Sequence, residues 1–208
     1  SASVAHSPLH FNANVIPVHP AKGPVTGAVN APERNATARM AYSFITTGDK
    51  FSVADNAKFN FSGSDSFTFS VWIKLPQITS SAAEILNIYK NGGIEIMIAG
   101  TDNPGNIGKL EVSNYDGING VQKFIAYSDS AVKLNQWQHI LVTINKSTNT
   151  VKAYLSGRLC MTVSSSIYTF NSAGLTIGNH VTFNWPFKGS IDDVRIYKRV
   201  LNQNEINA

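Results

Sequence analysis

The segment Phe67–Leu75, which reads FTFSVWIKL, constrains the fold more than any other part of the chain. Every odd-numbered residue in it is apolar, whereas the even-numbered residues are Thr68, Ser70, Trp72 and Lys74. Because successive side chains of an extended strand point to opposite faces, this alternation separates an apolar row from a mostly polar one. We therefore predict a β-strand with one face buried against a core.

Similar short segments follow one another along most of the chain. The other predicted strands are Tyr42–Ile45, Phe51–Val53, Glu84–Tyr89, Ile94–Ala99, Lys109–Tyr115, Val121–Ser128, Gln138–Asn145, Val151–Leu155, Arg158–Val163, Leu175–Gly178 and Ser190–Lys198. Turn-forming residues separate several of them, at Asn91–Gly93, Asp116–Gly117, Asn119–Gly120 and Ser156–Gly157. Since no helical stretch of about 10 to 15 residues lies between the strands, a parallel α/β fold is excluded. The pattern predicts an all-β antiparallel sandwich or barrel.

The two ends of the chain differ from this pattern. Five of the eight prolines fall within the first 35 residues, so regular structure there is expected to be short and interrupted. Asn202, followed three residues later by Glu205, forms a capping-box pattern that predicts a helix over Gln203–Asn207. No linker or repeat divides the chain, so we expect one domain over residues 1–208, with residues 1–8 as a flexible extension. The first residues include neither an initiator Met nor a signal region, which suggests a processed chain and makes export an expectation.

Charge and hydropathy exclude two classes of partner. The 17 Lys and Arg residues are scattered without any run of three, so the chain lacks the basic stripe that nucleic-acid binding needs. Its apolar runs are much shorter than the roughly 20 residues of a membrane span, so no membrane insertion is expected. The one cysteine, Cys160, lies among apolar residues and is predicted to be buried and unreactive.

The strand predicted at Ser190–Lys198 contains the most informative acidic residue. If Val194 and Ile196 point inward, alternation with period two turns Asp192 inward as well. An unpaired carboxylate in a dry interior is too costly to persist, so Asp192 needs backbone N–H donors, a basic partner or a metal. Two interpretations stay open: hydrogen bonds to a neighbouring loop, and a Ca²⁺ site that combines Asp192 with loop carbonyls.

Catalytic patterns are absent from the sequence. The five histidines are too widely spaced for a zinc signature, and neither a nucleophile elbow nor a phosphate loop occurs. His139 lies within a predicted strand and is interpreted as a packed or hydrogen-bonded side chain. Glycoside hydrolysis needs two carboxyl groups at one site, but no glutamate has another acid two or four residues away. The adjacent Asp192 and Asp193 diverge in a strand, so a hydrolase is not expected.

Binding remains, and three loop regions combine aromatic rings with amide or carboxylate groups, as sugar-binding sites do. They are Asn114–Asp116, Tyr168–Asn171 and Asn179–Trp185. The candidate ligand-binding residues are Trp185, Phe183, Asn184, Tyr115, Asp116 and Asn114, and Trp185 is the best single candidate. For the aromatic rings the alternative is a structural role, with the ring folded onto the end of the sandwich. Trp72 is a second aromatic candidate that a covering loop could equally bury, and Trp137 is interpreted as structural.

Three segments, taken in order, resemble the LamG-like jelly-roll family, the laminin-G-type branch of the concanavalin A-like lectin/glucanase superfamily. They are Phe67–Lys74, Leu134–Arg158 and Leu175–Ile206, and the last is the most specific. A weaker likeness over Leu9–Phe44 extends the resemblance to roughly residues 9–206. The resemblance implies a two-sheet antiparallel jelly-roll sandwich, to which the sequence adds the short C-terminal helix. It also implies a protein that is secreted or on the cell surface, often as part of a larger multidomain protein.

Together with the loop aromatics, the resemblance favours a non-catalytic extracellular module that binds carbohydrate. A protein-binding adhesion module is the alternative, and a glucanase-type hydrolase is the third hypothesis. Structural calcium is frequent in the family, and Asp192 matches the first acid of its closing motif. Two Asp-Gly pairs that are usual in the family are replaced here by Ser156–Gly157 and Ile45–Thr46, which leaves Asp49 and Asp55 as further candidate calcium ligands.

Overall fold

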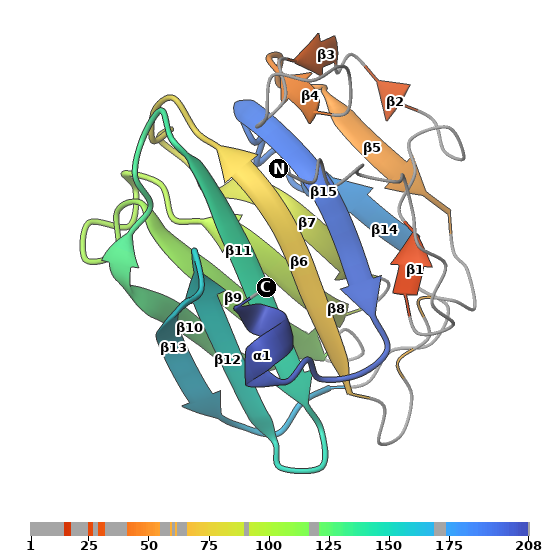
Figure 1. The fold of residues 1–208 in the computed structure, drawn as a ribbon. Coiled ribbons are helices and arrows are strands. Elements are labelled where there is room, and N and C mark those ends of the chain that lie inside the picture. The colour runs from red at the N-terminus through yellow and green to blue at the C-terminus, as the bar shows by residue number, and fades with distance from the viewer. Residues whose placement is uncertain are drawn as a thin grey trace, which may run out of the picture.

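The computed structural model describes residues 15–17, 25–26, 29–31, 41–54, 59, 61, 66–89, 92–116, 121–168 and 174–207. Within these residues two antiparallel β-sheets pack face to face, and one short helix follows near the C-terminal end (Figure 1). The prediction of an all-β jelly-roll sandwich with a short C-terminal helix is therefore confirmed. The expectation of a flexible extension over residues 1–8 lies outside the described residues.

The first sheet contains eight strands. They are β1 (Val15–Pro17), β3 (Val29–Ala31), β4 (Ala41–Phe44), β6 (Phe67–Lys74), β11 (Trp137–Asn145), β12 (Thr150–Leu155), β13 (Arg158–Ser164) and β15 (Gly189–Tyr197). Their order across the sheet is β13-β12-β11-β6-β15-β4-β3, and β1 pairs with the end of β15 that β4 leaves unpaired. The central strand β6 buries Phe67, Phe69, Val71 and Ile73 in the core, as its alternating sequence predicts.

The second sheet contains seven strands. They are β2 (Val25–Thr26), β5 (Lys50–Val53), β7 (Ala83–Tyr89), β8 (Gly92–Ile98), β9 (Lys109–Asp116), β10 (Val121–Ala131) and β14 (Gly174–Ile177). Their order is β10-β9-β8-β7-β14-β5-β2, so four strands that follow one another in the chain also lie side by side. The inner face of this sheet packs on the first sheet, and its outer face carries the polar groups described below.

The core fills the space between the two sheets. It includes apolar side chains from both, among them Phe69, Ile73, Ile88, Ile96, Val112 and Val142. Burying one side chain of this kind stabilises the fold by about 1.5–3 kcal/mol. Cys160 belongs to the same cluster, and burial raises the pKa of its thiol to about 11, so the prediction of a buried cysteine is confirmed.

The predicted elements agree closely with the observed ones. Every strand predicted between Tyr42 and Lys198 is present, with ends that differ by at most three residues. The helix α1 (Gln203–Ile206) has the predicted capping box, in which Asn202 and Glu205 each accept the other's backbone N–H. Ile206 packs with Leu141 and Tyr154 of the first sheet, and α1 lies over the outer face of that sheet (Figure 1). The proline-rich start forms the short strands β1, β2 and β3, in agreement with the expected interruptions.

One prediction within β15 is wrong. Asp193 has a positive φ of 50°, and the pairing of β15 with β6 changes register beyond Asp192. Because this bulge breaks the alternation, Ile191 and Ile196 both face the core although they are an odd number of residues apart. Asp192 instead pairs with Trp72, whose side chain lies on the outer face of the sheet, so Asp192 does not point into the core.

Candidate functional site

The outer face of the second sheet carries a polar row that crosses four neighbouring strands. Glu84 on β7 pairs with Met97 on β8. Met97 pairs in turn with Glu111 on β9, and Glu111 pairs with Tyr127 on β10. Because directly opposed residues in a sheet have side chains on the same face, Glu84 and Glu111 flank Met97.

A second polar row lies next to the first on the same face. Asn87 on β7 pairs with Glu95 on β8, and Glu95 pairs with Ser113 on β9. The three glutamates are enclosed, because Glu84 is 0%, Glu95 3% and Glu111 8% exposed. Three carboxyl groups that lie together under cover repel one another when ionised, so protonation or partners must relieve the repulsion.

Glu84 is the glutamate with the fewest partners. Neither of its carboxyl oxygens has a hydrogen-bond partner among the described residues. Burial raises the pKa of Glu84 well above its usual value, and the charges of Glu95 and Glu111 raise it further. The nearby Asn87 amide and Ile96 N–H lower the pKa of Glu84 and so partly offset this rise, although neither meets the geometry of a hydrogen bond to its carboxyl group. This environment favours the neutral carboxylic acid.

Glu111 is the glutamate that reaches the surface. Burial raises its pKa to about 7, the Tyr127 hydroxyl lowers it by donating a hydrogen bond, and the charges of Glu95 and Asp102 raise it. The Nδ2 of Asn103 donates to the hydroxyl oxygen of Tyr127 over 2.9 Å. A hydrogen-bonded chain therefore runs from the 99–108 loop through Tyr127 to Glu111, whose charge changes close to neutral pH.

The segment 178–187, which we call the cover loop, folds over this polar face between β14 and β15. Asn179 fastens it, because its Oδ1 accepts hydrogen bonds from the N–H groups of His180 and Trp185, each over 2.9 Å. The Nδ2 of Asn179 donates to a backbone carbonyl in the β4–β5 turn over 2.8 Å. The carbonyl of Trp185 accepts a hydrogen bond from the N–H of Glu84 over 3.0 Å. The backbone beneath the Trp185 side chain is thus tied to the sheet.

His180 also holds the cover loop in place, from the side that faces the sheet. Its Nδ1 accepts hydrogen bonds from the N–H groups of Thr182 and Phe183, each over 2.9 Å. Its Nε2 lies 3.0 Å from Oε1 of Glu95, whose other oxygen accepts a 2.9 Å hydrogen bond from the Ser113 hydroxyl. Since a nitrogen that accepts two N–H bonds carries no proton, the proton of the neutral imidazole is on Nε2 and points at Glu95.

The imidazole of His180 is also the centre of an aromatic cluster. The ring centroids of Phe183 and Trp185 lie 4.8 and 5.1 Å from it, and Tyr89 meets it edge-on at 5.4 Å. Phe183 and Trp185 stack on each other, with centroids 4.8 Å apart and an angle of 26° between the ring planes. Because Phe183 is 52% exposed, the stack presents an aromatic surface to solvent.

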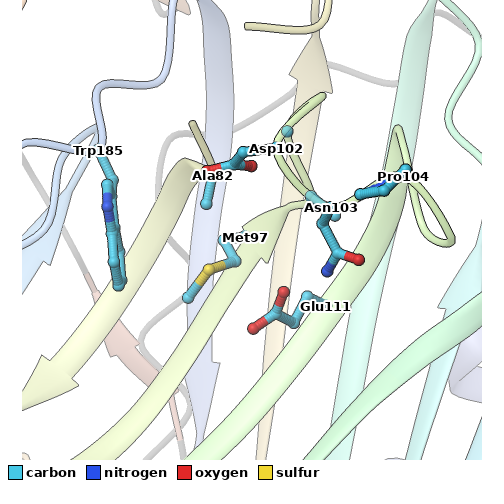
Figure 2. Close-up of a pocket in the computed structure, with 9 residues that line it drawn as sticks. Ala82, Met97, Asp102, Asn103, Pro104, Glu111 and Trp185 are labelled. Carbon is cyan, nitrogen blue, oxygen red and sulfur yellow. The ribbon is translucent and has the colours of Figure 1, made fainter. Parts of the chain in front are cut away.

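A pocket of about 330 Å³ lies between the cover loop and the 99–108 loop that joins β8 to β9. We call it the Trp185 pocket. Figure 2 shows the Trp185 ring on one side, Glu111 and Asn103 on the other, and Met97 between them. Asp102, from the 99–108 loop, also lines it. The pocket therefore places one aromatic wall opposite a group of hydrogen-bonding side chains.

A second pocket, of about 380 Å³, is lined by Thr47, Gln77, Ile78, Thr79, Ser80, Ser81, Asn184, Pro186 and Lys188. We call it the Lys188 pocket. Asn184 and Pro186 are the chain neighbours of Trp185, so the same backbone segment borders both pockets. The charged residue that lines the Lys188 pocket is basic, whereas those that line the Trp185 pocket are acidic.

Four of the six predicted ligand-binding residues lie around this face. Trp185 lines the first pocket, Asn184 lines the second, and Phe183 directly precedes them on the cover loop. Tyr115 on β9 shares the outer face with Glu111, since the two are four residues apart on one strand. Burial, together with the nearby glutamates, raises the pKa of Tyr115 to about 12.

The other two predicted residues, Asn114 and Asp116, are not among those that line the two pockets. Asn114 is buried, donates to the carbonyl of Gly93 over 2.8 Å and accepts from the N–H of Tyr168 over 2.7 Å. The carboxylate of Asp116 lies 3.8 Å from Nζ of Lys123. Their part in ligand binding stays a prediction, and residues 169–171 of the candidate loop Tyr168–Asn171 lie outside the described residues.

The remaining aromatic and histidine predictions concern the first sheet. His139 lies 2.8 Å from the hydroxyl of Ser70, which confirms a hydrogen-bonded histidine. Its ring centroid lies 5.1 Å from that of Trp72, so the two side chains pack on each other.

Sequence reasoning missed Glu84, Glu95, Glu111 and His180. The search for paired acids compared positions along one strand, whereas these glutamates come from three neighbouring strands. A search along single strands therefore could not find the cluster, although its finding that no glutamate has another acid two or four residues away holds. Each glutamate lies within a predicted strand, which is the one signal that the sequence offers. The register between neighbouring strands, which brings the glutamates together, cannot be read from any single segment.

The described residues do not bring the candidate calcium ligands together into one group. Asp49 is buried and accepts hydrogen bonds from the N–H groups of Ile45 and Thr46, so it closes the β4–β5 turn. Asp55 lies outside the described residues, and Asp192 lies on the outer face of the first sheet. Among the residues that the structure describes, no three His, Cys, Asp or Glu side chains are grouped to hold a metal ion. Calcium binding by Asp192 stays a prediction.

The profile of a family described as the concanavalin A-like lectin/glucanases superfamily matches residues 46–207. The chain belongs to this superfamily. The resemblance noted in the sequence is thereby confirmed, and the matched region includes both pockets and the whole cover loop. A comparison with curated proteins finds no match.

Solved structures share the fold at low sequence identity. The binding domain of Paraclostridial Mosquitocidal Protein 1 is 20% identical with a TM-score of 0.69, over 88% of this chain and 45% of that one. The receptor-binding domain of botulinum neurotoxin type G is 14% identical with a TM-score of 0.64, over 88% and 44%. Domain 4 of AbnA, a GH43 extracellular arabinanase from Geobacillus stearothermophilus, solved in complex with arabinotriose, is 18% identical with a TM-score of 0.62, over 88% and 80%. The chain thus spans less than half of each toxin domain.

Proposed function

We propose that this chain is a non-catalytic module that binds carbohydrate in the Trp185 pocket. The observation that carries the proposal is the placement of the Trp185 ring opposite Glu111 and Asn103 (Figure 2). A sugar ring has apolar C–H faces and hydroxyl groups around its edge. An aromatic ring packs on such a face, while carboxyl and amide groups hydrogen-bond the hydroxyls.

The anchoring of the cover loop supports this proposal. Asn179 and His180 hold the backbone and rings of the loop through hydrogen bonds to buried groups. A platform that is already ordered loses little conformational freedom when a ligand binds, which favours affinity. The arabinotriose complex of the AbnA domain is consistent with a sugar ligand on this fold, although function depends on the side chains of each site.

A binding role is favoured over hydrolysis by the burial of the acid cluster. Of the three glutamates, Glu111 lines the pocket, while Glu84 and Glu95 are covered by the loop and by each other's strands. The cluster therefore presents one carboxyl group to the pocket, and the other acid that lines it, Asp102, comes from the 99–108 loop. A hydrolase would have to use Asp102 and Glu111 as its pair, and not the buried cluster. Release of reducing sugar from a β-glucan by the pure protein would revive the glucanase hypothesis.

We further propose that the module acts outside the cell, within a larger protein, on a glycan partner. The toxin and arabinanase domains that share its fold are named as parts of binding or extracellular proteins. Among the described residues, no helix is long and apolar enough to cross a membrane.

A protein partner is the second candidate. The observation that favours it is the exposure of two apolar side chains on the cover loop, Val181 and Phe183. Capture of a specific protein that competing sugars do not displace would support this alternative. Variants Val181→Ser and Phe183→Ser would then abolish capture.

The main experiment is calorimetric titration with a panel of neutral, acidic and amino oligosaccharides, with and without Ca²⁺. We expect at least one glycan to bind, and Trp185→Ala to weaken it by about tenfold or more, since aromatic stacking contributes roughly 0.5–1.5 kcal/mol beyond the buried area. Leu159→Ala is the control, because Leu159 is also apolar and accessible to solvent but lies on β13 of the first sheet. Binding that is equally strong in Trp185→Ala, or absent for every glycan, contradicts the proposal.

A further inference from the structure

The Trp185 pocket differs in charge from the chain around it. The chain has a net charge of +4, yet the charged residues that line this pocket are Asp102 and Glu111. Glu95 adds a third carboxyl group within electrostatic range of Glu111. Lys109, at the base of the 99–108 loop, is not among the lining residues, because its ammonium binds the carbonyl of Gly105 at 3.4 Å and Oδ1 of Asn106 at 3.2 Å.

A second observation concerns the unpartnered acid beneath the pocket. Glu84 is fully buried on the same face, next to the pocket residue Met97, and its two carboxyl oxygens have no hydrogen-bond partner among the described residues. The Oδ1 of Asn87 is likewise buried without a partner in this part of the chain. Oxygen atoms therefore gather around the pocket floor with few donors to match them. Because Glu84 is favoured as the neutral acid without such a partner, a ligand that brings a positive charge would favour the ionised form of the carboxyl groups around the pocket.

We propose that the Trp185 pocket selects an amino sugar, a sugar ring that bears a protonated amine, over a neutral sugar of the same shape. The inference rests on the carbohydrate-binding function proposed above and names its ligand class. The ammonium group would form charge-assisted hydrogen bonds with Asp102 and Glu111, which are stronger than bonds between neutral groups. The Trp185 face would attract the same charge through its π electrons.

The shape of the pocket favours a sugar amine over a lysine side chain. A volume of about 330 Å³ beside the stacked rings of Phe183 and Trp185 suits a sugar ring, which can pack a C–H face on an aromatic ring, better than a single alkyl stem. A lysine-rich protein is the other source of the same ammonium group, and the experiment separates the two.

The experiment compares three oligosaccharides of identical length and linkage near neutral pH. They are β-1,4-linked trimers of glucosamine, N-acetylglucosamine and glucose, each titrated calorimetrically against the full chain. We expect the glucosamine trimer to bind about tenfold more tightly than the other two, which corresponds to one charge-assisted hydrogen bond of about 1.4 kcal/mol. Added salt should reduce this advantage, because it screens the charges.

Two variants test the residues named. Asp102→Asn and Glu111→Gln keep the shape of each side chain and remove its charge, so together they should abolish the preference for the amine. Glu205→Gln is the matched control, because Glu205 lies on α1 against the first sheet and Gln also supports a capping box. The control should retain the full preference.

The outcomes separate the inference from the function on which it rests. If Trp185-dependent binding is as tight for neutral trimers as for the glucosamine trimer, the inference is wrong and the proposed function stands. The same holds if other neutral glycans bind and all three trimers fail. If a lysine-containing peptide binds as tightly as the glucosamine trimer, the assignment to a sugar amine is overturned. If no glycan of any charge binds, the proposed function is wrong and the inference falls with it.

Discussion

Replacing Glu111 by Gln should stabilise the protein, and the gain should grow with pH. The pKa of Glu111 is raised by burial to about 7, whereas an unburied glutamate titrates near 4.5. The folded state therefore binds the proton more tightly than the unfolded state does. By linkage, the contribution of Glu111 to stability is fully present below pH 4.5 and is lost as the pH rises through 7.

The size of the effect follows from the two pKa values. One pH unit corresponds to about 1.4 kcal/mol, so ionising Glu111 in the folded protein costs about 3 kcal/mol at pH 8 and less than about 1 kcal/mol at pH 5. A glutamine in the same place cannot ionise, and its side-chain oxygen can still accept the hydrogen bond that Tyr127 donates to Glu111. Between pH 5 and pH 8, the free energy of unfolding of Glu111→Gln should therefore rise by roughly 2 kcal/mol relative to that of the wild type.

Urea unfolding followed by tryptophan fluorescence at several pH values measures this difference. Comparing the two proteins at each pH cancels the groups that titrate in both. Glu205→Gln is the control of opposite sign, since Arg199 and the N–H of Asn202 lower the pKa of Glu205 to about 2. That variant should lose stability above pH 4.5. A difference between Glu111→Gln and the wild type that is constant from pH 5 to pH 8 would refute the desolvation of Glu111.

Two further predictions concern the cover loop of the site, and a third concerns the helix α1. His180→Ala removes the acceptor for two backbone N–H groups of the cover loop, so it should cost about 2–4 kcal/mol of stability in urea unfolding and make the Trp185 fluorescence more quenchable by iodide. Gly178 has a φ of 85°, and a Cβ there would overlap the Phe44 ring, so Gly178→Ala should lower stability by about 2 kcal/mol or more. Asn202→Ala removes the helix cap and should cost about 1 kcal/mol, with sugar binding unchanged.

The sequence predicts the sheets well because the signal for a strand is local. The alternation in Phe67–Leu75 predicts one row of core-facing side chains. The pairing of β6 with β11 and β15 leaves those side chains facing the core, as predicted. The same reasoning fails at Asp192, because a single residue with positive φ shifts the alternation and nothing in the local pattern announces it. Local patterns therefore predict which segments are strands, and a bulge decides which face a residue occupies.

The acid cluster could not be predicted for a different reason. Alternation with Ile94 and Ile96 correctly turns Glu95 away from the core, and a strand residue turned away from the core is ordinarily solvated. What encloses Glu95 is the cover loop, which follows β14 some eighty residues later in the chain. Burial of these carboxyl groups is thus a property of long-range contact and cannot be read from any single strand.

The cover loop connects these observations, because its own polar side chains hold Trp185, the leading candidate, in place. Asn179 accepts the N–H groups of the next residue and of Trp185, and His180 accepts those of Thr182 and Phe183. The two side chains together fix the path of the whole segment. Its polar residues therefore shape the loop, and its aromatic residues are left to present their rings. A loop built in this way depends on the neutral imidazole of His180, so a second proton on Nδ1 would remove two of the four hydrogen bonds that hold the aromatic wall of the pocket in place.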